Sequence, residues 1–177
     1  KTAARLARFV VAYLEHIEQP AERGLYLGCG FGLWRDVLRK LIQPLDYTGV
    51  EVSAYLCQEH GWEQGSVVDW QGAEAYDLVI CQGVLQYLDA RQARRAIRNL
   101  AANCGGALYL EALTREDWEQ NCDRERTDGD VYLRPAGWYR EALGRYFTNC
   151  GGGVYLSEDS PAVLYELEKL ATDSTEV

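Results

Sequence analysis

Three glycines at alternate positions are the first residues of this sequence whose type and spacing suggest chemistry. Gly28, Gly30 and Gly32 follow a short apolar run at residues 25–27 and precede apolar residues at helical spacing in residues 34–41. This pattern predicts a strand, a tight turn and a helix. Glycines let the backbone bend sharply and let a ligand approach without meeting a Cβ, while the helix N-terminus offers free N–H groups. Because the same glycines could simply form a turn, a second chemical group is needed to indicate a cofactor site.

Glu51 supplies that second group. It ends a second predicted strand at residues 47–51 and follows Gly32 by about 19 residues. This is close to the separation at which a doubly wound α/β fold places an acid on a ribose. A dinucleotide fingerprint would need glycine or alanine at position 33, where this chain has Leu33. The sequence therefore indicates a nucleoside cofactor and disfavours a nicotinamide dinucleotide.

The pattern G-x-G-x-G after a strand resembles the first motif of the class I S-adenosylmethionine-dependent methyltransferases, E/D-x-G-x-G-x-G. Residues 77–88 are similar to the fourth motif of that family, D-x-(V/I)-x-x-x-x-V-L-x-H/Y-L, and the resemblance spans roughly residues 5–168. The chain departs from the family at Tyr26, where the family usually carries an acid that helps hold the methionine end of the cofactor.

The resemblance implies S-adenosyl-L-methionine as cofactor and S-adenosyl-L-homocysteine as product. Glu51 is then expected to bind the ribose hydroxyls. Asp69 ends a third predicted strand at residues 65–70, and the resemblance implies that it accepts a hydrogen bond from the adenine amino group, with Trp70 beside the ring; the alternative is that Asp69 caps a turn. We expect cofactor contacts from Gly28, Cys29, Gly30, Gly32, Glu51, Val52, Val68, Asp69, Trp70 and Gln82.

The acceptor is expected to bind where the sheet's carboxyl edge opens. Gln82 and Tyr87 follow the fourth predicted strand at residues 76–81, and an irregular, acid-rich segment at residues 113–134 follows the fifth at 107–112. Insertions at this edge of an open α/β sheet are placed to cover a ligand. The candidates for acceptor binding are Tyr87, Trp118 and Arg134. The Arg134 guanidinium suits an anionic group, and an ion pair with neighbouring acids is its alternative.

The predicted fold is a single doubly wound, mostly parallel seven-stranded sheet with helices on both faces and a C-terminal antiparallel hairpin. We expect an N-terminal helix within residues 1–20, a cofactor-binding part at 21–112 and a cover for the acceptor site at 113–134. The hairpin is predicted from residues 151–156 and 162–167, and the polar tail at 171–177 is expected to fray. Ser53, Asp89 and Thr114 are predicted helix caps.

Charge and cysteine usage narrow the partners. The formal net charge is −9, which argues against nucleic-acid binding, and the arginines of the helix after Asp89 are interpreted as a solvated face. The six cysteines form no C-x-x-C pair, so buried thiols are favoured over disulfides or a metal site. These features, with no signal peptide and no apolar run of transmembrane length, predict a cytoplasmic protein without a membrane partner. The sequence leaves the oligomeric state open.

We therefore expect a methyltransferase that transfers a methyl group to a small-molecule acceptor by in-line displacement. Holding two reactants in register can supply on the order of 7–11 kcal/mol, so the reaction needs no dedicated catalytic residue, and none stands out in the sequence. Two alternatives stay open. A non-catalytic binding module of the same fold is supported by Tyr26, and a nicotinamide-dependent oxidoreductase is disfavoured by Leu33.

Overall fold

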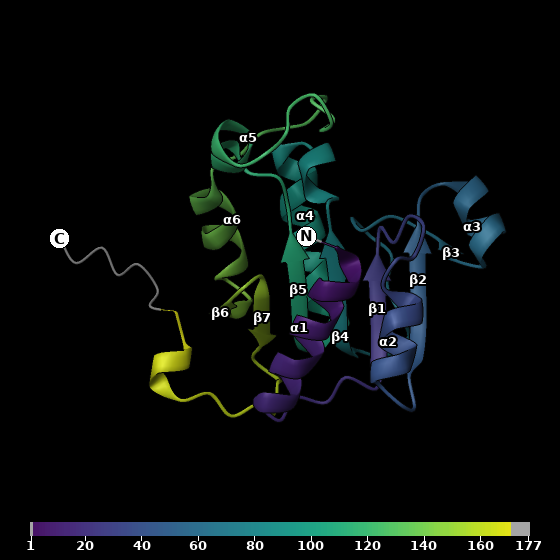
Figure 1. Cartoon of the computed structure of the whole chain (residues 1–177), viewed down its shortest axis with the longest axis vertical. Coiled ribbons are helices and arrows are strands. Elements are labelled where there is room, and N and C mark those ends of the chain that lie inside the picture. Colours follow the sequence, from purple (N-terminus) through teal and green to yellow (C-terminus); the bar gives the residue numbers. More distant parts are fainter. Residues whose placement is uncertain (1, 171–177) are drawn as a thin grey trace.

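The computed structural model describes residues 2–170, which form a seven-stranded sheet in the order β3-β2-β1-β4-β5-β7-β6 (Figure 1). The first five strands along the chain run parallel, and β7 runs antiparallel to both β5 and β6. This confirms the predicted sheet. The strands are β1 (Arg23–Leu27), β2 (Asp46–Glu51), β3 (Glu63–Gln64), β4 (Tyr76–Gln82), β5 (Cys104–Glu111), β6 (Phe147–Gly151) and β7 (Val154–Ser157).

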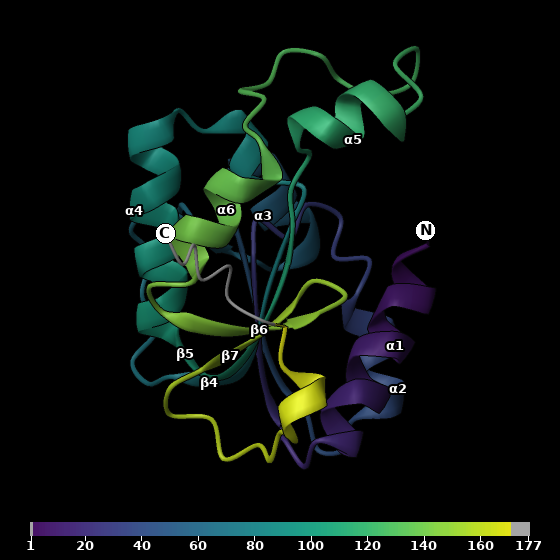
Figure 2. The same cartoon turned by 90° about the vertical axis from the view of Figure 1, so that its left-hand side faces the viewer.

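Helices cover both faces of the sheet (Figures 1 and 2). One face carries α1 (Ala3–His16) and α2 (Arg35–Leu41), and the other carries α4 (Ala90–Asn103) and α6 (Ala136–Leu143). The shorter helices are α3 (Ala54–His60), which packs beside β2 and β3, α5 (Arg115–Gln120), and the 3-10 helices η1 (Leu85–Tyr87) and η2 (Glu166–Glu168). Figure 2 shows α5 and its flanking loops above the carboxyl edge of the sheet.

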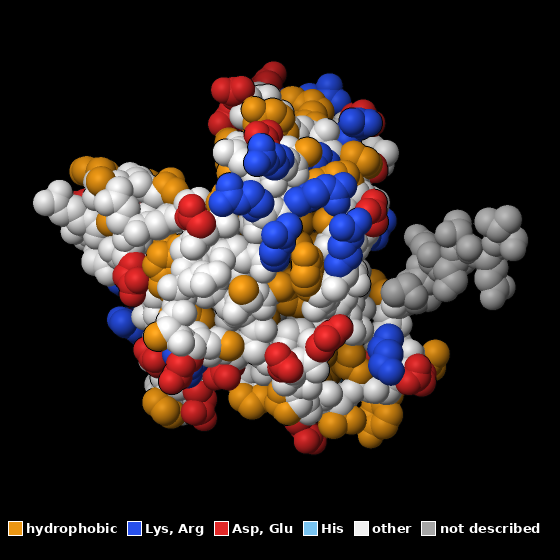
Figure 3. All heavy atoms as spheres, turned by 180° about the vertical axis from the view of Figure 1, so that it is seen from behind, with side chains coloured by type: hydrophobic (Ala, Val, Ile, Leu, Met, Phe, Trp, Pro, Cys, Tyr) orange, Lys and Arg blue, Asp and Glu red, His pale blue; other side chains and the backbone are white. Residues whose placement is uncertain are grey.

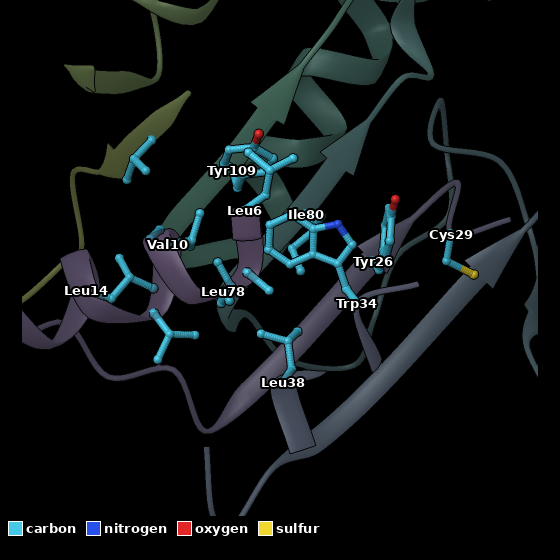
Figure 4. Packing of buried hydrophobic residues seen from close by; sticks show 14 of the residues in the cluster. Leu6, Val10, Leu14, Tyr26, Cys29, Trp34, Leu38, Leu78, Ile80 and Tyr109 are labelled. Carbon is cyan, nitrogen blue, oxygen red and sulfur yellow. The ribbon is translucent and has the colours of Figure 1, made fainter. Parts of the chain in front are cut away.

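The hydrophobic core between the sheet and the helices α1 and α2 packs against the glycine turn. Leu6, Val10 and Leu14 of α1 lie on the side of the helix that faces the sheet, as Figure 4 shows, because apolar residues recur there at helical spacing. Trp34, directly before α2, is fully buried between Tyr26 and Tyr109, with ring centroids 6.4 and 5.0 Å away. The turn between β1 and α2 is therefore closed by a large aromatic side chain.

The predicted caps are confirmed. The Ser53 hydroxyl accepts a hydrogen bond from the Leu56 N–H (3.3 Å), and the Thr114 hydroxyl accepts one from the Asp117 N–H (3.1 Å). Asp89 forms a full capping box at the start of α4. Each side chain satisfies an N–H that would otherwise lack a partner in the first helical turn.

The predicted third strand at residues 65–70 is wrong. The strand is only Glu63–Gln64, and the chain then turns, with the Trp70 N–H donating to the Ser66 carbonyl (2.9 Å). The side chain of Asn99 on α4 donates to the carbonyls of Val67 (3.1 Å) and Trp70 (2.7 Å). Because a side chain satisfies these carbonyls, the segment needs no ladder partner.

The predicted hairpin is also displaced. It forms from β6 and β7, joined where residues 151–153 all have positive φ, a region that glycine favours. Residues 162–167 form no strand; Val163 instead donates its N–H to the carbonyl of Ile17 after α1 (3.1 Å). The tail at 171–177 lies outside the described residues. No helix in residues 2–170 has the length and apolarity needed to cross a bilayer.

Candidate cofactor and acceptor site

A cavity of about 340 Å³ opens at the carboxyl edge, where β1, β2 and β4 end. It has the size and the largely apolar lining of a small-molecule site. Four residues predicted to bind the cofactor line it, together with Tyr87, which was predicted to bind the acceptor. The lining consists of Gly28, Glu51, Val52, Gly65, Ser66, Val67, Gln82, Gly83, Val84, Tyr87 and Leu88.

Glu51 is held at the end of β2 by backbone amides. One carboxylate oxygen accepts from the Gly30 N–H (2.9 Å), and the other accepts from the N–H groups of Val52 (2.9 Å) and Ser53 (3.1 Å). The residue is buried yet lines the cavity. Three charge-assisted bonds fix the carboxylate, and its remaining lone pairs can accept from ligand hydroxyls.

The surroundings of Gly28, Gly30 and Gly32 differ in what a side chain at each position would meet. A Cβ on Gly28, which lines the cavity, would lie 2.4 Å from the Val84 side chain, whereas a Cβ on Gly30 would meet nothing within 4 Å. A Cβ on Gly32 would lie 2.3 Å from the Trp62 ring, whose Nε1 donates to the Gly30 carbonyl (2.9 Å). Gly32 therefore makes room for Trp62, and it does not line the cavity.

Cys29 points away from the cavity into the core. It is only 3% exposed, and burial, with the Glu51 charge as a smaller cause, raises the pKa of its thiol to about 12. Any contact that Cys29 makes with a ligand in the cavity has to come from its backbone.

The adenine side of the predicted site differs from expectation. Val68, Asp69 and Trp70 do not line the cavity; Ser66 and Val67, which precede them, do. Asp69 is exposed in the turn after β3. A sequence pattern gives no signal for this shift, because it results from the turn that Asn99 holds from α4.

Gln82 joins the cavity to the core. Its Oε1 accepts from Nε1 of the buried Trp34 (2.8 Å), and its Nε2 lies 3.5 Å from an oxygen of Glu111. This arrangement sets the orientation of the amide beside the cavity. Gln82 is the last residue of β4 and lies beside the cavity, as expected for a residue at the carboxyl end of this strand.

Tyr87 meets the segment at residues 113–134, which lies above the edge (Figure 1). Tyr87 is on η1, and burial together with the Asp128 carboxylate, which is both a nearby charge and a hydrogen-bond partner, raises the pKa of its phenol. The Tyr132 N–H donates to the Gln86 carbonyl (2.8 Å), a second tie between this segment and η1.

Arg134, predicted to bind the acceptor, is buried and does not line the cavity. It is 6% exposed, and its guanidinium donates to the carbonyls of Leu85 (3.1 Å) and Leu88 and to the Tyr139 hydroxyl (3.1 Å). It also stacks over the Trp138 ring at 4.9 Å. Arg134 therefore fastens the end of the segment to η1 and α6, and neither an anionic ligand nor a surface ion pair explains its position.

Trp118 also has a structural contact. It does not line the cavity. Its ring packs against Gly129, where an added Cβ would lie 3.3 Å away, and the Arg124 guanidinium lies 5.7 Å from the ring centroid. Trp118 therefore packs against the loop at residues 121–130. Among the described residues, no group of three His, Cys, Asp or Glu side chains could hold a metal ion.

Residues 25–108 match the family model described as a methyltransferase domain. Similar folds are found in DesVI from Streptomyces venezuelae (TM-score 0.67, 14% identity, 88% of this chain and 91% of that chain) and in CalS10, an amino pentose methyltransferase from Micromonospora echinaspora (0.66, 14%, 89% and 91%). Magnesium protoporphyrin IX methyltransferase from Synechocystis PCC 6803 has a TM-score of 0.60 and 16% identity, covering 87% of this chain and 81% of that chain. A comparison with curated protein sequences found no significant match.

Residues 25–108 therefore match a methyltransferase domain, and the strand order of the whole sheet is shared with solved structures of the class I, Rossmann-like methyltransferase fold. Of the similar structures, CalS10 was determined with S-adenosyl-L-methionine bound and the Synechocystis enzyme with S-adenosyl-L-homocysteine bound. The buried carboxylate of Glu51 and the open space above Gly30 fit that cofactor, since a ribose needs acceptors for its hydroxyls and a close backbone approach.

Proposed function

We propose that the protein transfers the methyl group of S-adenosyl-L-methionine to a small-molecule acceptor by in-line displacement. The observation that carries the proposal is that one cavity at the carboxyl edge brings Glu51, Gln82 and Tyr87 together, and that Tyr87 contacts Asp128 of the segment at 113–134. When bound, the cofactor supplies a methyl group already activated by its sulfonium. The protein's task is then to hold two molecules in register and to exclude water.

The cofactor's adenosine is assigned to the β2 side of the cavity. Glu51 accepts hydrogen bonds from the ribose hydroxyls, and the exposed side chain of Val52 offers an apolar wall to the base. Ser66 and Val67 line the same part of the cavity. Asp69 remains a proposed partner of the adenine amino group, which it can reach only from the rim, because its side chain lies outside the lining.

The acceptor is assigned to the Tyr87 side, under residues 113–134, which we term the cover. The contact between Tyr87 and Asp128 ties the cover to the cavity mouth. A small molecule is favoured because a net charge of −9 repels polyanions and because two of the similar structures are, by name, methyltransferases of an amino pentose and of magnesium protoporphyrin IX.

The cofactor part is tested by calorimetry. S-adenosyl-L-homocysteine is expected to bind and NAD is not. Glu51→Gln is expected to weaken the binding of S-adenosyl-L-homocysteine at least tenfold, because charge-assisted hydrogen bonds contribute about 1.5–3 kcal/mol each. Glu59→Gln, which changes an exposed acid on α3, is the matched control. Saturable NAD binding without a signal from S-adenosyl-L-homocysteine would overturn the assignment.

The acceptor part is tested by replacing residues 115–130 with a short Gly/Ser linker. We expect retained cofactor binding and lost turnover on a panel of small amines and alcohols. Figure 3 shows that arginines gather on the face over α4, where Arg91, Arg94, Arg95 and Arg98 line a groove. Full turnover by the linker variant, or tight salt-dependent RNA binding through this face, would contradict a small acceptor under the cover.

A further inference from the structure

The end of β1 lacks a carboxylate at the position where the first motif of the family has one. Tyr26 stands there, 6% exposed, and packs edge-on against Trp34 at 6.4 Å (Figure 4). Burial raises the pKa of this phenol, so it keeps its proton and carries no negative charge that could balance a cation. The methionine part of the proposed cofactor carries an α-ammonium group, which needs an anionic or carbonyl partner when it leaves water.

Glu111 lies on the same face of the sheet, one step nearer the carboxyl edge. Tyr26 pairs with Ile80 in the ladder between β1 and β4, and Gln82, two residues after Ile80, pairs with Glu111 at the end of β5. Side chains two residues apart on a strand point to the same face, and adjacent strands lie about 4.8 Å apart. Glu111 is therefore about two strand spacings, roughly 10 Å, from the line of β1.

The contacts of Glu111 place its carboxylate next to Gln82 at the edge of the cavity, although Glu111 itself lines a neighbouring pocket. Its Oε2 accepts from the Tyr109 hydroxyl (3.2 Å) and lies 3.5 Å from Nε2 of Gln82, which lines the cavity. The Trp34 indole holds the other end of the Gln82 amide. Glu111 remains exposed, so its carboxylate is accessible to a ligand.

We propose that Glu111 binds the α-ammonium group of the cofactor's methionine moiety, in place of the acid missing at position 26. This inference rests on the proposed function. Glu111 acts as a binding and positioning residue: it transfers no proton, and it aligns the cofactor through the amino acid end while Glu51 holds the ribose end. The exposed carboxylate can reach a ligand in the space beside Gln82 without any change in the core.

The test compares two ligands that share adenosine and the thioether but differ in the amino acid. S-adenosyl-L-homocysteine has the α-ammonium group, and 5′-methylthioadenosine lacks it. By calorimetry, Glu111→Gln is expected to weaken the binding of S-adenosyl-L-homocysteine at least tenfold. The affinity for 5′-methylthioadenosine should stay within twofold of that of the unchanged protein. Glu111→Asp keeps the charge on a shorter side chain, so its affinity for S-adenosyl-L-homocysteine should lie between those of the unchanged protein and Glu111→Gln. Glu119→Gln, an exposed acid on α5, is the matched control.

The outcomes separate the inference from the proposed function. If Glu111→Gln weakens both ligands equally, or neither, Glu111 does not bind the ammonium group and the inference is overturned. If the unchanged protein binds neither ligand, the proposed function itself fails. Thermal melting of each variant checks the fold, which an exposed residue at a strand end is not expected to disturb.

Discussion

The turn after β1 and the cover at residues 113–134 lie at the same edge of the sheet, yet they are held in opposite ways. The turn is fixed mainly through its backbone N–H groups: those of Gly28 and Cys29 donate to the Val50 carbonyl (2.9 and 3.1 Å), and that of Gly30 donates to the Glu51 carboxylate. The cover is fixed by side chains and by contacts far along the chain, above all Arg134. A site built on backbone conformation leaves a short pattern in the sequence, whereas one built on distant side chains does not.

The largest effect is expected from Arg134→Ala. The substitution removes three charge-assisted hydrogen bonds and leaves the carbonyls of Leu85 and Leu88 buried, so we expect the free energy of unfolding to fall by about 4 kcal/mol. Arg134→Lys should recover little, because an ammonium lacks the planar fork. Urea unfolding measures the loss, and Arg145→Ala, which breaks only an exposed ion pair with Glu141, should change stability by less than about 0.5 kcal/mol.

This variant also separates the two regions. At a urea concentration where Arg134→Ala is still folded, its affinity for S-adenosyl-L-homocysteine should match that of the unchanged protein, since Arg134 does not line the cavity. A parallel loss of cofactor affinity would mean that the cover and the glycine turn behave as one unit.

Gly32→Ala is expected to cost about 3 kcal/mol. The new Cβ would lie 2.3 Å from the Trp62 ring, and the φ of +68° disfavours any residue with a Cβ. Gly30→Ala is the matched comparison, because its φ is also positive (+51°) but its Cβ would meet nothing within 4 Å. It should lose only about 1 kcal/mol from backbone strain. Equal losses in urea unfolding would show that Trp62 gives way and that strain alone decides.

The contrast explains what the sequence could predict. The strand, the glycine turn and the helix after it were predicted correctly, and Glu51 does end β2, because a turn and a strand end depend on local residue types. The position of Arg134 depends on carbonyls more than 45 residues earlier in the chain, and the turn at 65–70 depends on Asn99 of α4. The hairpin was displaced because residues 162–167 have strand-like composition but pack beside Ile17, a choice that only tertiary contacts make.

The last prediction compares the alkylation rates of one cysteine from each region, and it has the smallest expected effect on the protein. Cys29, in the glycine turn, has a thiol pKa raised to about 12 by burial, so at pH 8 only about one molecule in 10⁴ carries the reactive thiolate. Cys122, at the end of α5 in the cover, is partly exposed. We expect Cys122 to react at least a hundredfold faster at pH 8, as read by mass spectrometry of peptides, and Cys122→Ser to remove the fast phase.

The pH dependence sharpens this last comparison. Because the pKa of Cys29 lies above the working range, its thiolate fraction and its labelling rate should rise about tenfold for each pH unit from 8 to 11. The same shift destabilises the fold at high pH: the unfolded thiol loses its proton near pH 8.5, the folded one only near 12, so stability falls between these values. If Cys29 instead labels as fast as Cys122 at pH 8, the glycine turn opens as readily as the cover, and its backbone contacts do not hold it more firmly than side chains hold the cover.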